Sequence, residues 1–188
     1  MFLKNFKYRR SVSKEMARKI ISYNPLKQKR PSILGKKTKR VSDISSKVTQ
    51  KVIFELNDSL DRLITKYGIL NGIGLAAPQI NSNLRIAVIQ LPKKRVVMIN
   101  PKVIKKSKDS AVSAICCFSV QRYCGNIEHP KRIKIFYLDE KGKKRTYSVP
   151  KKNSVLFSHE IDHLNGILIV DRVKNKLRGL YKIAPKLN

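Results

Sequence analysis

Two histidines separated by three residues are the first feature of this sequence that could do chemistry. In the stretch LFSHEIDHLNG, His159 and His163 lie four positions apart, and Glu160 directly follows the first of them. Residues i and i+4 of an α-helix share one face, one turn apart, so two imidazoles at this spacing can bind one metal ion. A glutamate about 100° further round the helix can reach a water beside that ion and act as general base. The competing interpretation is a polar helix face that matches the pattern by chance.

The residues around the motif favour a buried helix. Asn153 and Ser154 are of the type that caps helix N-termini, and Asn165-Gly166 is a typical stop signal. Apolar residues stand three and four positions before the first histidine, so the histidine face continues upstream as an apolar stripe. We therefore expect a buried, metal-carrying helix that begins close to Asn153.

The third protein ligand has to come from elsewhere in the chain. A long metalloprotease signature would place a third histidine three residues after Gly166, but residues 167–169 are Ile, Leu and Ile. Thermolysin-type sites use a later glutamate, and no glutamate follows Glu160. The remaining candidates are upstream: Cys116, Cys117, Cys124 and His129. A cysteine thiolate is the most plausible third ligand among them.

Length and cysteine content bound the class of protein. The chain has 188 residues, 41% of them hydrophobic, which suits one core rather than two domains. No run approaches the ~18 apolar residues of a membrane span. Three cysteines, two of them adjacent, do not resemble a disulfide framework. We expect them to be reduced, in a metal-binding or inert role, and the protein to be cytoplasmic.

The charge is the strongest compositional signal. The chain carries 42 Lys and Arg against 12 Asp and Glu, a net charge of +30, and residues 16–42 contain no acidic residue. Such a field concentrates a protein near polyanions such as ribosomal RNA or an anionic membrane, and salt weakens the attraction. The competing interpretation is compositional, because Lys, Ile and Asn are abundant throughout. The basic start of the chain is not a secretory signal but is compatible with mitochondrial targeting.

Hydrophobic periodicity predicts a compact single α+β domain. Apolar residues at helical spacing predict an amphipathic helix over residues 46–67. Shorter β-rich runs predict strands and a hairpin, and strands with a few helices indicate an α+β fold. The expected extended segments are 85–91, 95–101, a hairpin over 132–149 that turns at 139–143, and a short stretch at 167–173.

Three stretches together resemble the signature motifs of the peptide deformylases. They are GIGLAAPQ at 72–79, CCFSV at 116–120 and HEIDHLNG at 159–166. The likeness covers roughly residues 46–175. The sequence of the third motif resembles the subclass common in low-GC Gram-positive bacteria. The likeness implies a basic N-terminal segment at 1–45 and a catalytic domain at 46–188, with antiparallel sheets around a central metal-binding helix.

The resemblance also implies a ligand set and a mechanism. The family's second motif is Glu-Gly-Cys-Leu-Ser, which places Cys117 at the position of the metal-binding cysteine, beside His159 and His163. Glu160 would transfer protons during hydrolysis of a formyl amide. Further expected site residues are Gln79 and the Phe118 backbone N–H as oxyanion donors, Gly74 as a substrate contact, and Ile73, Val155 and Leu156 as the apolar pocket for a methionine side chain.

The second motif departs from the family pattern. Ile115 stands where the family has Glu, and Cys116 where it has Gly. The usual basic partner of that Glu is also missing, with His129 close to its place, and replacing both members of a buried pair is tolerated better than losing one. Ser158 replaces a customary Gln. None of these positions is an expected metal ligand or the general base.

The resemblance names the cofactor and the partners. A Cys/His/His set with an open position suits Fe²⁺, with Zn²⁺ or another divalent ion as alternatives. The expected substrate is the formylated N-terminus of a nascent polypeptide, and the expected protein is a monomer that contacts ribosomal RNA through its basic surface. Two alternatives stay open: a catalytically impaired member that serves as a ribosome- or RNA-binding component, and a different small metalloprotease or amidase. A mitochondrial matrix location is the alternative to the cytoplasm.

Overall fold

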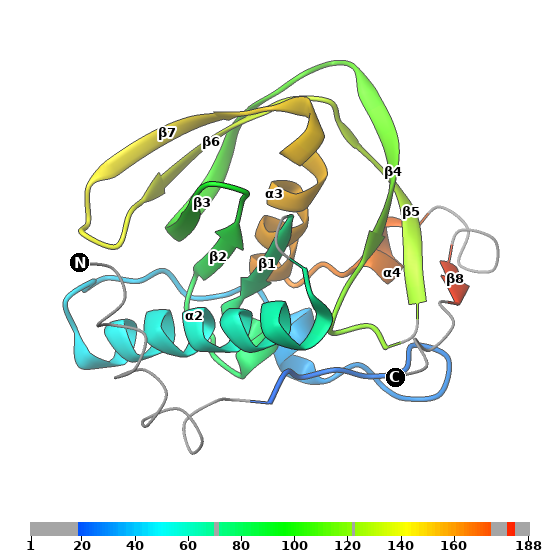
Figure 1. Ribbon diagram of the computed structural model, residues 1–188, viewed down its shortest axis with the longest axis horizontal. Coiled ribbons are helices and arrows are strands. Elements are labelled where there is room, and N and C mark those ends of the chain that lie inside the picture. The colour runs from blue at the N-terminus through cyan, green and yellow to red at the C-terminus, as the bar shows by residue number, and fades with distance from the viewer. Residues whose placement is uncertain (1–18, 70–71, 122, 174–179, 183–188) are drawn as a thin grey trace.

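Two antiparallel sheets and the helix between them form the frame of the protein (Figure 1). The computed structural model describes residues 19–69, 72–121, 123–173 and 180–182. The larger sheet has the strand order β1-β2-β3-β6-β7, and the smaller has the order β4-β5-β8. The strands are β1 (Ile73–Ala76), β2 (Ile86–Gln90), β3 (Arg95–Lys106), β4 (Ser110–Cys116), β5 (Tyr123–Pro130), β6 (Ile133–Leu138), β7 (Lys144–Val149) and β8 (Leu180–Lys182). The helices are η1 (Ser32–Gly35), α2 (Lys47–Tyr67), η2 (Ala77–Ile80), α3 (Lys151–Leu164) and α4 (Ile169–Arg172).

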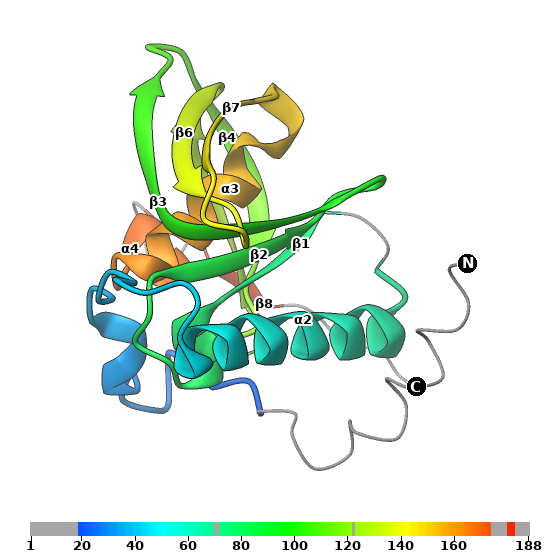
Figure 2. The ribbon, with the colours of Figure 1, turned by 90° about the vertical axis from the view of Figure 1, so that its left-hand side faces the viewer.

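The larger sheet is covered on both faces by helices. Successive residues of a strand point to opposite faces, and β2 shows the consequence. Val88 packs in the cluster with α2, while Ala87 and Ile89 pack with α3 in a second cluster. Figure 2 shows α2 below β1, β2 and β3, and α3 above them. Burial on both faces explains why residues 86–89 form a continuous apolar run.

Helix α2 confirms the amphipathic helix expected over residues 46–67. It begins after Ser46, whose side-chain oxygen accepts from the Thr49 backbone N–H at 3.2 Å. It ends at Gly68, which adopts the left-handed conformation with φ 64°. The apolar residues that suggested the helix are all buried against the sheet: Val52, Ile53, Leu56, Leu60 and Leu63.

The expected strands are present, but one expected extended segment is a helix. The strand pairs β2–β3 and β6–β7 confirm the expected runs, and Gly142 lies in the turn of the β6–β7 hairpin. Residues 167–173 were expected to be extended, and this prediction is wrong, because residues 169–172 form α4. The Asp171 carboxylate accepts from the Leu168 backbone N–H at 2.9 Å, which caps this single turn.

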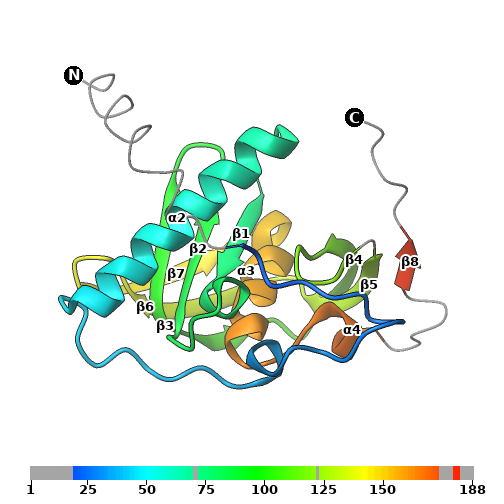
Figure 3. The ribbon, with the colours of Figure 1, turned by 90° about the horizontal axis from the view of Figure 1, so that it is seen from below.

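The described part of the N-terminal basic segment runs along the domain and contacts the loops near α3 (Figure 3). The Ile21 backbone N–H donates to the Gln79 carbonyl at 2.8 Å, and that of Tyr23 donates to the Ser119 carbonyl at 3.1 Å. Thr38 donates to the Leu164 carbonyl at the end of α3. Most of the basic start of the chain at residues 1–23, which is compatible with mitochondrial targeting, lies outside the described residues. Within the part of the chain that is described, no helix has the length and apolar character to cross a membrane.

Candidate metal centre

Helix α3 carries the two histidines but begins earlier than expected. Its N-cap is Pro150, which makes no side-chain cap, so the prediction that Asn153 and Ser154 cap the helix is wrong. Both residues lie inside the first turns, and the Ser154 hydroxyl donates instead to the Pro130 carbonyl at 2.6 Å. The expected stop is confirmed, since α3 ends at Leu164 and Gly166 has φ 75°.

The histidine pair is buried and faces inward. His159 is 5% exposed and His163 is fully buried, and their Nε2 atoms lie 3.1 Å apart. Burial lowers the pKa of His159 to about 4, and burial and then the neighbouring His159 lower the pKa of His163 well below its ordinary value. Both rings are therefore neutral at pH 7 and have electron pairs available for a cation.

Cys117, directly after β4, completes the set of ligands. Its Sγ lies 3.2 Å from the His163 Nε2, and the three ligand atoms of Cys117, His159 and His163 all lie within 4.8 Å of one another. Tetrahedral geometry with typical Zn–N and Zn–S bond lengths would separate such atoms by roughly 3.3–3.6 Å. The geometry thus fits one metal ion, and it selects Cys117 among the thiols that the sequence left open.

The other two cysteines are joined by a disulfide, contrary to the expectation that all three are reduced. Cys116 and Cys124 lie opposite each other in the β4–β5 pairing, with their Cα atoms 4.2 Å apart. Close Cα spacing is typical of the non-hydrogen-bonded pairs of antiparallel strands, where side chains approach most closely. Their separation of eight positions in the sequence gives no sign of this, because it depends on the register of the hairpin.

The surroundings of Cys117 favour a thiolate only when a cation is present. Burial raises the pKa of its thiol to about 12, while hydrogen bonds from the Ser119 and Val120 backbone act in the opposite direction. A coordinated metal ion removes this proton outright, because the thiolate is the ligand form. Two buried neutral imidazoles and a thiol that accepts amide hydrogen bonds therefore suit a borderline-soft divalent ion.

Glu160 lies against the backbone of β1. It is 2% exposed, and burial raises the pKa of its carboxyl to about 8. Its Oε2 is buried and has no hydrogen-bond partner among the described residues. A Cβ added to Gly74 would lie 2.6 Å from the Glu160 Oε1, closer than real Cβ atoms approach. Gly74, expected as a substrate contact, thus also makes room for the carboxyl group of Glu160.

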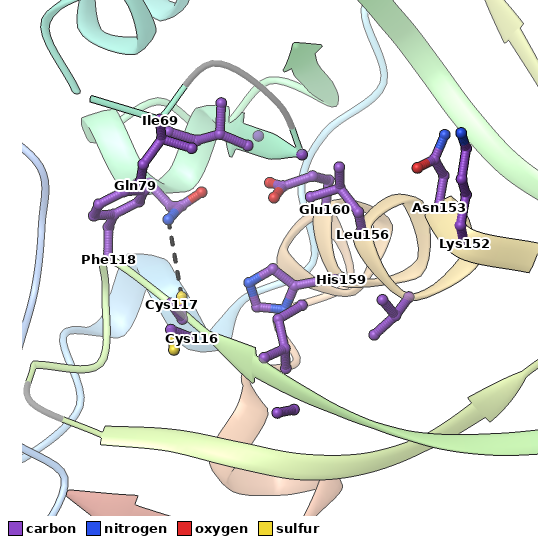
Figure 4. Close-up of a pocket in the computed structure, with 16 residues that line it drawn as sticks. Ile69, Gln79, Cys116, Cys117, Phe118, Lys152, Asn153, Leu156, His159 and Glu160 are labelled. Atoms are coloured by element: carbon purple, nitrogen blue, oxygen red, sulfur yellow. Dashed lines mark hydrogen bonds between the residues drawn. The ribbon is translucent and has the colours of Figure 1, made fainter. Parts of the chain in front are cut away.

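The side chain of Gln79 is oriented toward Cys117 by a hydrogen bond from the Ala76 backbone (Figure 4). Its Oε1 accepts from the Ala76 backbone N–H at 2.9 Å, which leaves the amide nitrogen facing the centre. That Nε2 lies 4.0 Å from the Cys117 Sγ and donates to the Ser119 hydroxyl at 3.3 Å. Ser119 therefore holds both Gln79 and the thiol of Cys117. Ser119 lies within the CCFSV stretch, but its residue type alone predicts no role there.

A cavity of about 340 Å³ opens beside these residues (Figure 4). Every expected non-ligand site residue lines it: Ile73, Gly74, Gln79, Phe118, Val155, Leu156 and Glu160. Of the ligands, Cys117 and His159 line it, while fully buried His163 lies behind them. Lys152, Asn153 and Ile69 also line the cavity, but they belong to no motif, so their place in the site was not predictable from the sequence.

Comparison with known proteins gives a consistent result. A model of the polypeptide deformylase family matches residues 19–178. A peptide deformylase of Heliobacterium modesticaldum is 36% identical over 129 residues, which cover 66% of this chain and 85% of that protein. One of Afipia carboxidovorans is 33% identical over 168 residues, covering 82% and 96%. The crystal structure of the Thermotoga maritima peptide deformylase superimposes with a TM-score of 0.73 at 27% identity, covering 85% of this chain and 99% of that one.

The family match includes the whole of α3, the second-motif loop and β1, which together build the cleft around Cys117, His159 and His163. Fold, motif order and ligand geometry therefore agree over most of the chain, and the chain belongs to the polypeptide deformylase family.

Proposed function

We propose that the centre built by Cys117, His159 and His163 removes the formyl group from the N-terminal formylmethionine of nascent polypeptides. The observation that carries this proposal is the convergence of the three ligand atoms within 4.8 Å beside a cavity that Glu160 also lines. The reaction is hydrolysis of an amide, and a divalent ion in the centre supplies Lewis acidity and lowers the pKa of a water towards ~7. We propose Fe²⁺ as the ion, with Zn²⁺ as the alternative.

Glu160 is proposed as the proton shuttle. Its carboxyl lines the cleft, and its pKa, raised to about 8 by burial, falls when a cation is bound nearby. An ionised Glu160 then takes a proton from the attacking water and returns it to the leaving amine. The missing hydrogen-bond partner of its Oε2 among the described residues supports this role, because that atom is available to the water.

Gln79 and the Phe118 backbone N–H are proposed to stabilise the oxyanion that forms on the formyl carbonyl. The amide of Gln79 is held in one orientation by Ala76, so its Nε2 is a preorganised donor. Phe118 directly follows the ligand Cys117 and lines the same cavity. One donor of this kind typically contributes about 10²–10³ in rate.

The peptide is proposed to bind beside β1. This strand is at the edge of the larger sheet, so its outer edge can accept an added strand, and Gly74 allows the close approach. The side chain of the first residue would lie in the apolar part of the cavity, against Ile73, Val155 and Leu156. Val155 and Leu156 belong to α3, one turn before His159, so they place this pocket next to the metal ligands.

Release of formate from formyl-Met-Ala-Ser by anaerobically prepared protein with Fe²⁺ tests the proposal. We expect turnover that the chelated protein lacks and that added metal restores. A Glu160→Gln variant serves as the matched control, because it keeps the three ligands. Wild-type protein with one bound metal per chain and no formate release above that control would reject the proposed activity.

We further propose that the basic surface holds the enzyme near ribosomal RNA. The expected contacts are the basic clusters within residues 16–42 and at Arg172, Lys174, Lys176, Arg178 and Lys182. Two arginines of these clusters are engaged by acids, since Arg30 pairs with Asp171 and Arg172 with Asp162. Exposed cations of the N-terminal segment are better placed for phosphates: Lys27, Lys29, Lys36, Lys37, Lys39 and Arg40. The expected contacts at Lys174, Lys176 and Arg178 lie outside the described residues.

Salt-dependent co-sedimentation with ribosomes tests this surface. Changing Lys36, Lys37 and Lys39 to Gln should lower the log–log salt slope by about 2–3, at roughly 0.7–0.9 per lost phosphate contact. The matched control removes the same charge elsewhere, by changing Lys105, Lys106 and Lys108 to Gln, and should leave the slope unchanged. Equal effects of both sets would mean that the charge acts only through its total. The division at residue 45, the monomeric state, the subclass and the cellular location stay predictions.

A further inference from the structure

A polar pair, half-buried Ser113 and buried His129, lies on one face of the β4–β5 hairpin, outside the metal centre. His129 of β5 is 6% exposed, and its Nε2 lies 2.9 Å from the Ser113 hydroxyl of β4. In the strand register Ser113 is opposite Ile127, so the pair spans the hairpin diagonally. Such diagonal neighbours on one face are within reach of long side chains.

The pair continues into α3 through one backbone carbonyl. The His129 Nδ1 lies 3.0 Å from the Pro130 carbonyl oxygen, and the same oxygen accepts from the Ser154 hydroxyl at 2.6 Å. A carbonyl oxygen only accepts, so Nδ1 carries the proton, and in the neutral ring Nε2 then accepts from the Ser113 hydroxyl. The result is one continuous hydrogen-bonded chain: Ser113, His129, Pro130 and Ser154.

The two ends of this chain belong to the two segments that supply the metal ligands. Ser113 is four residues before Cys117, and Ser154 is five residues before His159. A cavity of about 520 Å³ lies between these segments and is lined by Ser113, His129 and the first turn of α3. The hydrogen bonds connect β4 to α3 beside this cavity, through His129 and the Pro130 carbonyl of β5.

We infer that His129, with Ser113 and Ser154, is a positioning residue that fixes Cys117 relative to the two histidines. The inference rests on the proposed metal-dependent function. The local hydrogen bonds from Ser119 and Val120 do not fix the distance of Cys117 from His159, which depends on contacts between segments far apart in the sequence.

Spectroscopy of the Co²⁺-loaded protein tests this inference without any measurement of turnover. The visible d–d bands and the thiolate-to-cobalt charge-transfer band report the geometry of the cysteine ligand. We expect Ser113→Ala and His129→Gln to shift both and to raise the dissociation constant for Co²⁺ roughly 10-fold, near the lower end for groups that orient metal ligands. Ser113→Thr keeps the hydroxyl and should restore wild-type spectra.

The matched control is Ser110→Ala. Ser110 also makes a hydrogen bond across this hairpin, to Glu128 at 2.7 Å, but on the exposed face and without a connection to α3. It should lower thermal stability slightly and leave the cobalt spectrum unchanged. If Ser113→Ala lowers stability but keeps the wild-type spectrum and affinity, the chain is only structural and the inference is wrong. A wild-type protein that binds cobalt normally but releases no formate would instead reject the proposed function alone.

Discussion

The two segments that supply the metal ligands, α3 and the end of β4, differ in what holds their ligands in place. In α3 the separation of His159 and His163 is set by one helical turn, whatever the rest of the protein does. Cys117 follows strand β4, which is placed by its pairing with β5, and β5 in turn contacts α3. The two histidine ligands are therefore placed by local helix geometry, whereas the cysteine ligand is placed by contacts between residues far apart in the sequence.

Burial shifts the pKa of the histidine ligands and the pKa of the cysteine ligand in opposite directions. It lowers the pKa of His159 to about 4, which keeps this ring ready to bind a metal, but raises that of Cys117 to about 12, which keeps its thiol protonated. The helix thus supplies ligands that need no proton loss, while the strand supplies one that must lose a proton to the solvent. Metal binding should accordingly release one proton from the thiol and, below about pH 8, a second from the Glu160 carboxyl, and it should weaken as pH falls.

Removing the thiolate should have the largest effect. We expect Cys117→Ser to abolish tight metal binding or to change the metal selected, and to abolish formate release, because no other described thiol reaches the two imidazoles. Metal content per chain by elemental analysis checks this. Cys116→Ala is the matched neighbour and should keep one metal per chain. If Cys116→Ala loses the metal while Cys117→Ser keeps it, the ligand assignment is wrong.

The Glu160→Gln variant in α3 should lose turnover but keep its bound metal. The variant removes the proton shuttle but no ligand, so turnover should fall by about 10²–10⁴, the usual contribution of general acid–base catalysis. Metal content should remain one per chain. Single-turnover formate release measured beside metal content checks both statements. Turnover close to wild type would remove Glu160 from the mechanism.

The same variant makes a pH prediction for the metal-free protein. The Glu160 pKa is about 8 in the folded chain against an ordinary 4.5, so between these values the folded state holds a proton that the unfolded state has lost. The free energy of unfolding should therefore fall as pH rises across this window, and Glu160→Gln should remove that fall. The lowered pKa of His159 gives an opposite rise from about pH 4 to 6.5 in both proteins. Urea titrations at pH 5 and pH 8 measure the difference.

Gly74→Ala should have a smaller effect on turnover. The added Cβ displaces the Glu160 carboxyl, and displacements of about 1 Å at a reacting group can cost up to 10²-fold in rate. We expect kcat to fall by roughly 10–100-fold with the metal retained. Glu160→Asp shortens the side chain and relieves the contact, so the double variant should lose less than the two single losses combined. Strict additivity would contradict the proposed contact.

The smallest effect on activity is expected from the disulfide beside the strand ligand. Cys124→Ser breaks the bond to Cys116 but leaves Cys117 in place. Closure of a short loop contributes about 2–3 kcal/mol to the free energy of unfolding, so chemical denaturation under oxidising conditions should show a loss of that size. Turnover and metal content should change little. A large loss of metal would mean that the disulfide also positions Cys117.

Features that repeat within a few residues were predictable from the sequence. Helix α2 follows from apolar positions at helical spacing and from Ser46 and Gly68 at its ends, and the β6–β7 hairpin from two β-rich runs around Gly142. The histidine pair and Glu160 follow from one helical turn. The resemblance of the motifs to a known family added Cys117 and the arrangement of antiparallel sheets around the metal-binding helix, and the family match confirms that resemblance.

Tertiary structure alone decided the rest. Helix α3 begins after Pro150 and not at Ser154. Ser154 has a residue type that suits a cap, but its hydroxyl donates instead to the Pro130 carbonyl of β5. The stretch at 169–172 is a helical turn because Asp171 caps it and Arg172 pairs with Asp162. The partners Cys116–Cys124 and Ser113–His129 meet only through the hairpin register. Contacts of this kind depend on how distant segments pack, and a one-residue change of register would separate them.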